Sequence, residues 1–175
     1  CGVSTAGAQA SAPDSAAVRD AERAVEETPK DARAQVRLGR LYLDAGRGDE
    51  ALRAFKKAIS LDRDLADAYN GVGLYYMNVK RNWKMASRYF NLALNKDWSH
   101  KEAQFNMALL QVHMGNYDAK EAAERVLKID PNYAPAYRLM GRWYEEMQED
   151  YEVAALWYTR YLALKPDDPE VRVRL

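Results

Sequence analysis

The apolar residues of this chain recur at the spacing of amphipathic helices, in a pattern that repeats along the sequence. Leu38, Leu41 and Tyr42 fall on one side of a helix, and a second apolar stripe with Ala51 and Phe55 follows after a short polar turn. Similar pairs of stripes come later in the chain. Because side chains three and four positions apart share a helix face, each pair of stripes predicts two helices that pack against each other.

Small residues mark the period of this pattern. Four of them recur at spacings of 34, 35 and 33 residues, namely Gly39, Gly73, Ala108 and Gly141. A second series in step with the first is Ala51, Ala86, Ala119 and Ala154. A period near 34 residues is the signature of a helical repeat array. We therefore expect an all-α array of helix pairs in which each small residue lets two helices approach closely, and such arrays offer extended binding surfaces.

The residues at fixed places in this period resemble the tetratricopeptide repeat (TPR) family. An aromatic residue stands at the fourth place of two units, an apolar-glycine pair at the seventh and eighth places of three, and proline near the end of two. These residues are Tyr69, Tyr137, Leu38-Gly39, Val72-Gly73, Met140-Gly141, Pro131 and Pro166. The resemblance covers residues 32–168 and implies a right-handed superhelical TPR solenoid of antiparallel helix pairs.

Four full units are expected within residues 31–168, at 32–65, 66–100, 101–133 and 134–168. A half unit at 15–30 precedes them, in which Ala17, Ala21 and Ala24 take the packing positions of a second helix, and a truncated helix at 169–175 follows. The turns differ in length. Units two and four carry an extra residue near 81–83 and near 149–150, and unit three lacks one after Asp118. Trp98, just before unit three, is expected to fill the junction between units.

Composition limits the classes of partner. The 175 residues carry 26 basic and 26 acidic side chains, so the formal net charge is zero. That balance argues against a general nucleic-acid binder, which is basic on one face. No apolar run approaches the roughly 20 residues that a membrane span needs.

The only cysteine is Cys1, and residues 2–14 are small or polar. A segment of this composition cannot build a core, so residues 1–14 are expected to form a flexible tether. Cys1 with this tether resembles the start of a mature bacterial lipoprotein, which implies covalent lipid on Cys1 and a place on the periplasmic face of the bacterial outer membrane. The alternative is that the cysteine is a remnant of cloning or trimming.

The sequence shows no catalytic constellation. The two histidines, His100 and His113, lie thirteen residues apart and match no metal-ligand spacing. Neither a nucleophile motif nor a phosphate-binding loop is present. We therefore expect no enzyme activity, no metal and no cofactor other than the lipid.

The TPR resemblance implies that the first helices line a concave groove that binds peptide segments. Mapping the family's groove positions predicts these binding residues: Val36, Arg40, Leu43, Asn70, Leu74, Met77, Phe105, Leu109, Val112, His113, Arg138 and Arg142. The predicted groove has an exposed apolar middle and arginines at its ends, which suits a helix or an extended segment of a protein partner. Alternatively, the tether or the terminal helix fills part of the groove.

The architecture and the anchor together predict a non-enzymatic scaffold that binds a protein partner in the envelope. The chain resembles the pilotin-type TPR lipoproteins that help secretin subunits assemble for type IV or Tad pili. Two alternatives share the compartment. One is an adaptor for cell-wall enzymes or for outer-membrane protein insertion, and the other is a permanent structural subunit of a large envelope machine.

Overall fold

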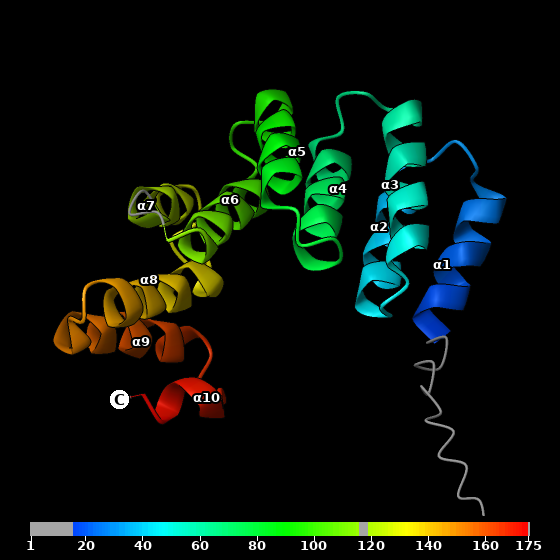
Figure 1. Ribbon diagram of the computed structural model, residues 1–175. Helices are drawn as coiled ribbons and strands as arrows, with labels where there is room; N and C mark the ends of the chain where they lie inside the picture. Colours follow the sequence, from blue (N-terminus) through cyan, green and yellow to red (C-terminus); the bar gives the residue numbers. More distant parts are fainter. Residues whose placement is uncertain (1–15, 116–118, 175) are drawn as a thin grey trace, which may run out of the picture.

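A computed structural model (Figure 1) describes residues 16–115 and 119–174, and in these ranges the protein is all-helical, without strands. The helices are α1 (Ala16–Glu27), α2 (Ala32–Asp44), α3 (Gly48–Leu61), α4 (Ala66–Asn78), α5 (Trp83–Lys96), α6 (Lys101–His113), α7 (Ala119–Ile129), α8 (Ala134–Met147), α9 (Tyr151–Leu164) and α10 (Pro169–Arg172). The predicted all-α solenoid is confirmed. The predictions for Cys1, for the tether at 1–14 and for the shortened turn after Asp118 lie outside the described residues.

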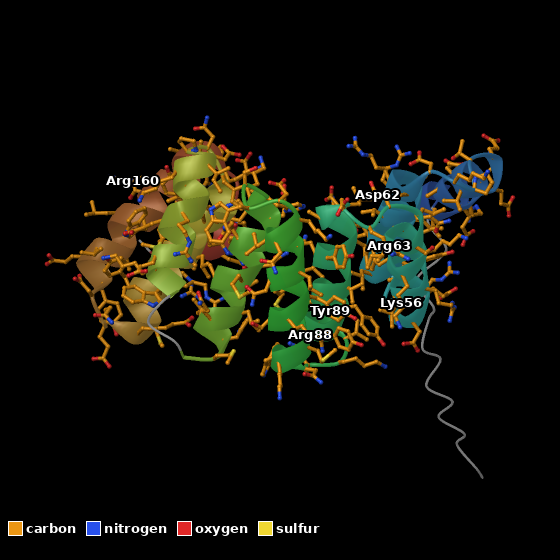
Figure 2. All side chains as sticks on the ribbon, turned by 90° about the horizontal axis from the view of Figure 1, so that it is seen from above. Lys56, Asp62, Arg63, Arg88, Tyr89 and Arg160 are labelled. Carbon is orange, nitrogen blue, oxygen red and sulfur yellow. The ribbon has the colours of Figure 1, made fainter. Side chains whose placement is uncertain are left out.

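Helices α2 to α9 form four antiparallel pairs that stack in chain order (Figure 1). Each pair is turned relative to the one before it, so that α8 and α9 cross the direction of α2 and α3. In α3 and α5 the outward face is charged, and Figure 2 shows Lys56 and Arg88 pointing away from the array. The first helix of each pair lies on the other side, where the concave face is built.

Glycines in three of the first helices lie directly against aromatic rings of the second helices. A Cβ added at any of the three would come within 2.4–2.6 Å of a ring carbon. The pairs are Gly39 with Phe55, Gly73 with Phe90, and Gly141 with Tyr158. Real Cβ atoms do not approach carbon so closely, and interiors at crystal-like density have no room to relax. The small residue is therefore the condition for the aromatic ring to lie between the helices.

Unit three lacks this contact between a glycine and an aromatic ring. Ala108 replaces the glycine, and Ala123 stands where the other units have an aromatic residue. Both alanines are fully buried in one cluster with Met140 and Trp143. A Cβ is tolerated at position 108 because the facing residue, Ala123, has no ring. Side chains from α8 fill the remaining space.

Backbone hydrogen bonds locate the extra residues in the turns. In unit one the N–H of Arg47 donates to the carbonyl oxygen of Tyr42, five residues earlier, over 2.7 Å. The matching bonds in units two and four span six residues. They run from Asn82 to Tyr76 at 2.9 Å and from Asp150 to Tyr144 at 3.1 Å. The closing bond is kept while the turn grows by one residue, which confirms the two predicted insertions.

The inserted turns adopt a backbone conformation that usually calls for glycine. Arg81 and Glu149 both have φ of 52°, whereas the turn of unit one uses Gly46 at φ 73°. Non-glycine residues in this left-handed region incur a steric cost between Cβ and the carbonyl oxygen. The chain therefore holds mild strain in two of its turns.

Helix α1 packs on α2 as a half unit, but not through the predicted alanine positions. Val18 is its buried residue, at 1% exposure, whereas Ala17 is exposed and Ala21 is half-buried. The prediction for Ala17 is wrong, because the helix is rotated so that the larger Val18 reaches the core. The hydroxyl of Tyr42 donates to Glu22 Oε1 over 2.8 Å and ties the half unit to unit one.

At the other end, α10 packs on α9 as the start of a further first helix. Val171 is buried with Tyr158 and Tyr161, and Asp168 Oδ1 caps the helix by accepting the N–H groups of Glu170 and Val171. Four residues thus suffice to cover the aromatic side chains of the last full unit.

Trp98 does not fill the junction before unit three. Its side chain is 66% exposed, so that prediction is wrong. The junction is instead closed by Gln104, which is 1% exposed and donates from Nε2 to the carbonyl oxygen of Trp98 over 3.1 Å. The backbone of Trp98, and not its side chain, therefore contributes to the junction.

Among the described residues, no helix is both long and apolar enough to cross a membrane.

Candidate functional site

One pocket on the concave face collects side chains from α6 and α8. It has a volume of about 350 Å³ and is bounded by Phe105, Leu109, His113, Pro135, Arg138, Leu139, Arg142 and Tyr161. Five of the twelve predicted groove residues meet here: Phe105, Leu109, His113, Arg138 and Arg142. A volume in this range accommodates one or two large side chains of a ligand.

Helix periodicity brings these residues together. Phe105, Leu109 and His113 are four residues apart and therefore lie along one face of α6. The other sides of α6 are also apolar, because Ala103 and Leu110 are buried against neighbouring helices. Helix α6 therefore buries apolar residues against its neighbours and still offers an apolar row to the groove.

The apolar wall has little freedom to move. Phe105 and Leu109 are half-buried and pack against the core cluster that contains Leu139 and Trp143. The ring of Phe105 also meets Tyr133 edge-on, with centroids 5.4 Å apart and planes at 68°. Such aromatic contacts favour a fixed ring orientation, so the apolar wall is formed before a ligand arrives.

Two arginines form the polar rim. Arg138 and Arg142 lie one turn apart on α8. Arg142 Nε donates to Glu146 Oε1 over 3.1 Å, one turn further along the helix. Arg138 Nη1 reaches Asp168 Oδ2 only at 3.5 Å. Neither Glu146 nor Asp168 is among the described residues that bound the pocket, so the rim presents the two guanidinium groups to a ligand.

Asp168 is held mainly by other groups. Its Oδ2 accepts a 2.6 Å hydrogen bond from the hydroxyl of Tyr161, and its Oδ1 caps α10. The Tyr161 hydrogen bond is the main cause that lowers the pKa of Asp168, and the cap and the charge of Arg138 act the same way against the effect of burial. Asp168 therefore stays ionised, while the guanidinium of Arg138, which borders the pocket, offers further N–H donors that suit a ligand carboxylate.

Four of the predicted groove residues are buried. Val36, Asn70, Met77 and Val112 are only 5%, 2%, 4% and 7% exposed. The prediction of an exposed apolar middle is wrong for Met77 and Val112, because helices pack against each other there, whereas Val36 still borders a shallow depression with Arg40. Leu43 and Leu74 are half-buried at the groove and lie outside the pocket.

At the N-terminal end of the groove, Arg40 belongs to a chain of charges. Its Nη2 donates to Asp67 Oδ1, and His100 Nε2 lies 3.4 Å from the same oxygen. His100 Nδ1 accepts the N–H of Ala103 over 3.1 Å and so caps α6. Burial of His100 opposes protonation, but the hydrogen bond and charge of Asp67, together with the charges of Glu102 and Asp97, raise the pKa of His100. This end is polar and ordered by its own ion pairs.

Sequence reasoning missed part of the site. Leu139 and Tyr161 bound the pocket, yet both stand at positions that pack helices together, and no sequence signal marked them for the groove. Asp67 and His100 were also missed as partners of Arg40. Asp67 and His100 are 33 residues apart, which is one repeat unit, and this spacing could have indicated that they lie side by side.

The comparison with family models settles the class of repeat. Residues 39–79 match a TPR repeat model and residues 105–169 match a tetratricopeptide repeat model. The chain carries tetratricopeptide repeats. The second range includes all the residues that bound the pocket, so the candidate site is built from TPR units.

Solved TPR structures show the same fold. The crystal structure of TTC0263, a thermophilic TPR protein from Thermus thermophilus, has a TM-score of 0.79 at 20% identity and covers 90% of this chain and 86% of that one. The crystal structure of PilW, described as a widely conserved type IV pilus biogenesis factor, has a TM-score of 0.73 at 21% identity, with coverages of 85% and 68%. At these identities the likeness concerns the fold.

A curated relative is the human protein O-mannosyl-transferase TMTC3, which is 28% identical over 83% of this TPR chain. The match covers 16% of that protein, and the chain spans about a sixth of the length of the curated relatives it matches. The similarity therefore concerns a small part of each relative.

In residues 16–115 and 119–174, no three or more His, Cys, Asp or Glu side chains gather as metal ligands. The pocket instead combines an apolar wall, a cationic rim and a histidine. Chemically, this arrangement can hold an apolar side chain and a nearby carboxylate.

Proposed function

We propose that this TPR protein is a non-enzymatic scaffold whose pocket between α6 and α8 holds a segment of a protein partner. The observation that carries the proposal is the meeting of Phe105, Leu109, His113, Arg138 and Arg142 at one concave pocket. TPR domains are in general protein-binding modules, and this pocket is a part of the groove where apolar side chains stay accessible.

The pocket indicates the chemistry of the bound segment. An apolar side chain fits against Phe105 and Leu109, and an acidic group fits beside Arg138 and Arg142. Arginine guanidinium groups bind carboxylates with two parallel hydrogen bonds. Both a helix and an extended segment can present an apolar and an acidic side chain together, so a partner segment of either conformation fits the pocket.

We further propose that the protein is anchored by lipid on Cys1 at the periplasmic face of the bacterial outer membrane. There it would assist assembly or stability of an outer-membrane complex such as a type IV or Tad pilus secretin. The lone cysteine with the small polar residues after it supports the anchor, and the likeness in fold to PilW supports the pilus role. The alternatives are an adaptor for cell-wall enzymes or membrane-protein insertion, or a permanent machine subunit.

A catalytic role is not part of this proposal. The sequence lacks nucleophile and phosphate-binding motifs, and the similarity to the O-mannosyl-transferases spans about a sixth of their length. A match to such a small part of an enzyme carries no activity to this chain.

Site-specific photo-crosslinking in the native envelope tests the partner proposal. A photo-reactive amino acid is placed at Leu109 in the pocket or at Leu156, a 65% exposed residue of α9 outside it. We expect crosslinks from position 109 to a subunit of an outer-membrane assembly, and none from position 156. Crosslinks confined to position 156, or to a soluble protein outside the envelope, would contradict the proposal.

The anchor has a separate test. Mass spectrometry of the mature N-terminal peptide is expected to show acyl chains on Cys1. An unmodified Cys1 would remove the anchor from the proposal and leave the pocket proposal untouched.

A further inference from the structure

A second surface lies at the turn between the helices of unit two and has no role in the groove. It is a shallow depression formed by Lys80, Arg81, Asn82, Trp83, Lys84, Ser87 and Met114. We call these residues the unit-two edge.

The unit-two edge is cationic. Lys80, Arg81 and Lys84 are all exposed, and no carboxylate is among the residues that form the depression. A nearby acid is Asp49, whose Oδ1 lies 3.5 Å from Lys80 Nζ and also accepts the hydroxyl of Tyr75. Lys80 therefore shares this carboxylate with Tyr75, and among the described residues no ion pair joins Arg81 or Lys84 to an acid.

Apolar surface is exposed among these cations. Met114 is 60% exposed, and Val79, next to Lys80, is 45% exposed. The indole of Trp83 is half-buried and stacks on the imidazole of His113, with ring centroids 6.0 Å apart and planes at 15°. This stack holds the indole at the surface, beside Met114.

The position of this edge in the array is specific. Because successive helices alternate in direction, the turn of unit two lies on the same edge of the array as the first residue of α1, Ala16 (Figure 1). The opposite edge faces the viewer in Figure 2 and carries Asp62 and Arg63. Aspartates recur in the loops between units, at Asp31, Asp62, Asp64, Asp97 and Asp130, and two of them pair with lysines, Asp64 with Lys96 and Asp130 with Lys101.

We propose that the unit-two edge binds the surface of a membrane that contains anionic phospholipids. Lysine and arginine attract the phosphate groups of lipids, and each adds about a fivefold gain in binding near an anionic surface. Tryptophan favours the interface between headgroups and acyl chains, and Val79 and Met114 supply apolar contact. The aspartates of the loops between units offset the neighbouring lysines and arginines, so the opposite edge attracts the same surface less and contact through the unit-two edge is favoured.

This orientation places the docking pocket beside the membrane. His113 bounds the pocket on one side and stacks on Trp83 on the other. A partner held by the pocket would therefore lie close to the lipid headgroups. Contact of the unit-two edge with lipid does not depend on which peptide the pocket binds.

Vesicle binding of the full chain tests the charge requirement. Sedimentation is measured with vesicles of phosphatidylcholine alone or mixed with phosphatidylglycerol. The Arg81→Gln, Lys84→Gln variant is expected to bind the anionic vesicles about twenty-five-fold more weakly than the unchanged chain, since two cations are lost. The matched control is Lys30→Gln, Arg63→Gln, which removes the same charge from the opposite edge and is expected to have no effect.

Tryptophan quenching tests the orientation. The chain is coupled through Cys1 to a maleimide lipid, so that surface attachment does not depend on affinity or on natural acylation. Brominated phospholipids are then expected to quench its fluorescence in anionic vesicles. Trp83→Phe should remove most of that quenching. Trp98→Phe, which removes the exposed indole of the opposite edge, should preserve it.

Several results would overturn the inference. Equal binding to neutral and anionic vesicles, equal losses in both glutamine variants, or quenching that depends on Trp98 would each do so. Inorganic phosphate that competes more strongly than sodium chloride at the same ionic strength would also contradict it, since the edge would then be a small-anion site. Thermal unfolding of each variant, matched to the unchanged chain, ensures that a loss of binding is not a loss of folding.

Discussion

The side chain of Asn106 in α6 donates a 2.9 Å hydrogen bond from Nδ2 to Oδ1 of Asn70 in α4. The two residues are only 8% and 2% exposed, so the bond crosses from unit two to unit three inside the protein. Buried amides are costly unless they are paired. This pair therefore fixes the relative position of two first helices beside the groove.

Removing both partners should cost less than the sum of the two single removals. We expect Asn70→Ala and Asn106→Ala each to lower the free energy of unfolding by about 1–3 kcal/mol, because each leaves a buried amide unpaired. The double variant should cost less than the sum of the two. Urea unfolding of the four proteins measures the coupling. Strictly additive losses would show that the hydrogen bond does not stabilise the junction.

The glycine–aromatic pairs predict a compensated exchange. Gly73→Ala should destabilise the protein by about 1–3 kcal/mol through overpacking, because the new Cβ would lie 2.4 Å from a ring carbon of Phe90. Adding Phe90→Ala should relieve that clash, as Ala108 and Ala123 do in unit three. The alanine at position 73 should therefore be harmless in the Phe90→Ala background, as measured by chemical denaturation. An unchanged penalty there would contradict the packing explanation.

The positive φ angles at Gly46 and Arg81 predict that replacing glycine by alanine lowers stability, whereas introducing glycine does not. Gly46→Ala should lower stability by about 1–2 kcal/mol, because a Cβ is disfavoured at positive φ, although no atom lies within 4 Å of the new Cβ. Arg81→Gly at the same backbone conformation should not lower it, since relief of strain offsets the added chain entropy. Thermal unfolding measures both changes. A loss of stability with Arg81→Gly would argue against strain in that turn.

The raised pKa of His100 predicts how stability varies with pH. A raised folded-state pKa contributes stability that is fully present below the unfolded-state value near 6.5 and is lost as pH rises through the folded-state pKa. We expect Asp67→Asn to lower the pKa of His100 and to remove this loss of stability. The pKa is followed by NMR and the free energy of unfolding by urea titrations on both sides of neutrality.

The matched control for this effect is Asp64→Asn. Asp64 pairs with Lys96 on the surface, whereas Asp67 is the aspartate that faces His100 Nε2. The control should leave the histidine titration as in the unchanged chain. A histidine pKa that is equal in the Asp67→Asn variant and the unchanged chain would contradict the role of Asp67.

The sequence was sufficient to predict the fold because each level of the pattern agreed with the others. The period of small residues, the helical apolar stripes and the turn lengths all pointed to helix pairs, and the inserted residues at 81–83 and 149–150 were found from spacing alone. The rotation of α1 was not predictable, since Ala17 and Val18 fit the helical pattern about equally. Their difference in size decides which one reaches the core.

The site was only partly predictable for a related reason. Family positions say which side of a first helix faces the groove, and this placed Leu109 and Arg142 at the pocket. They do not say how closely the next first helix approaches. That distance depends on contacts between units, such as the one between Asn70 and Asn106, and it decides that Met77 and Val112 are buried.

Binding of the captured partner to paired pocket variants tests the central claim most directly. Isothermal titration calorimetry compares the unchanged chain with Leu109→Asp in the pocket and Leu156→Asp outside it, and compares Arg142→Gln with Arg88→Gln on the outer face of α5. We predict that both pocket changes weaken binding at least tenfold, because a buried anchor or a carboxylate contact is lost. Both outer changes should leave the affinity unaltered. Equal affinities for the pocket and outer variants would contradict the assignment of the pocket as the docking site.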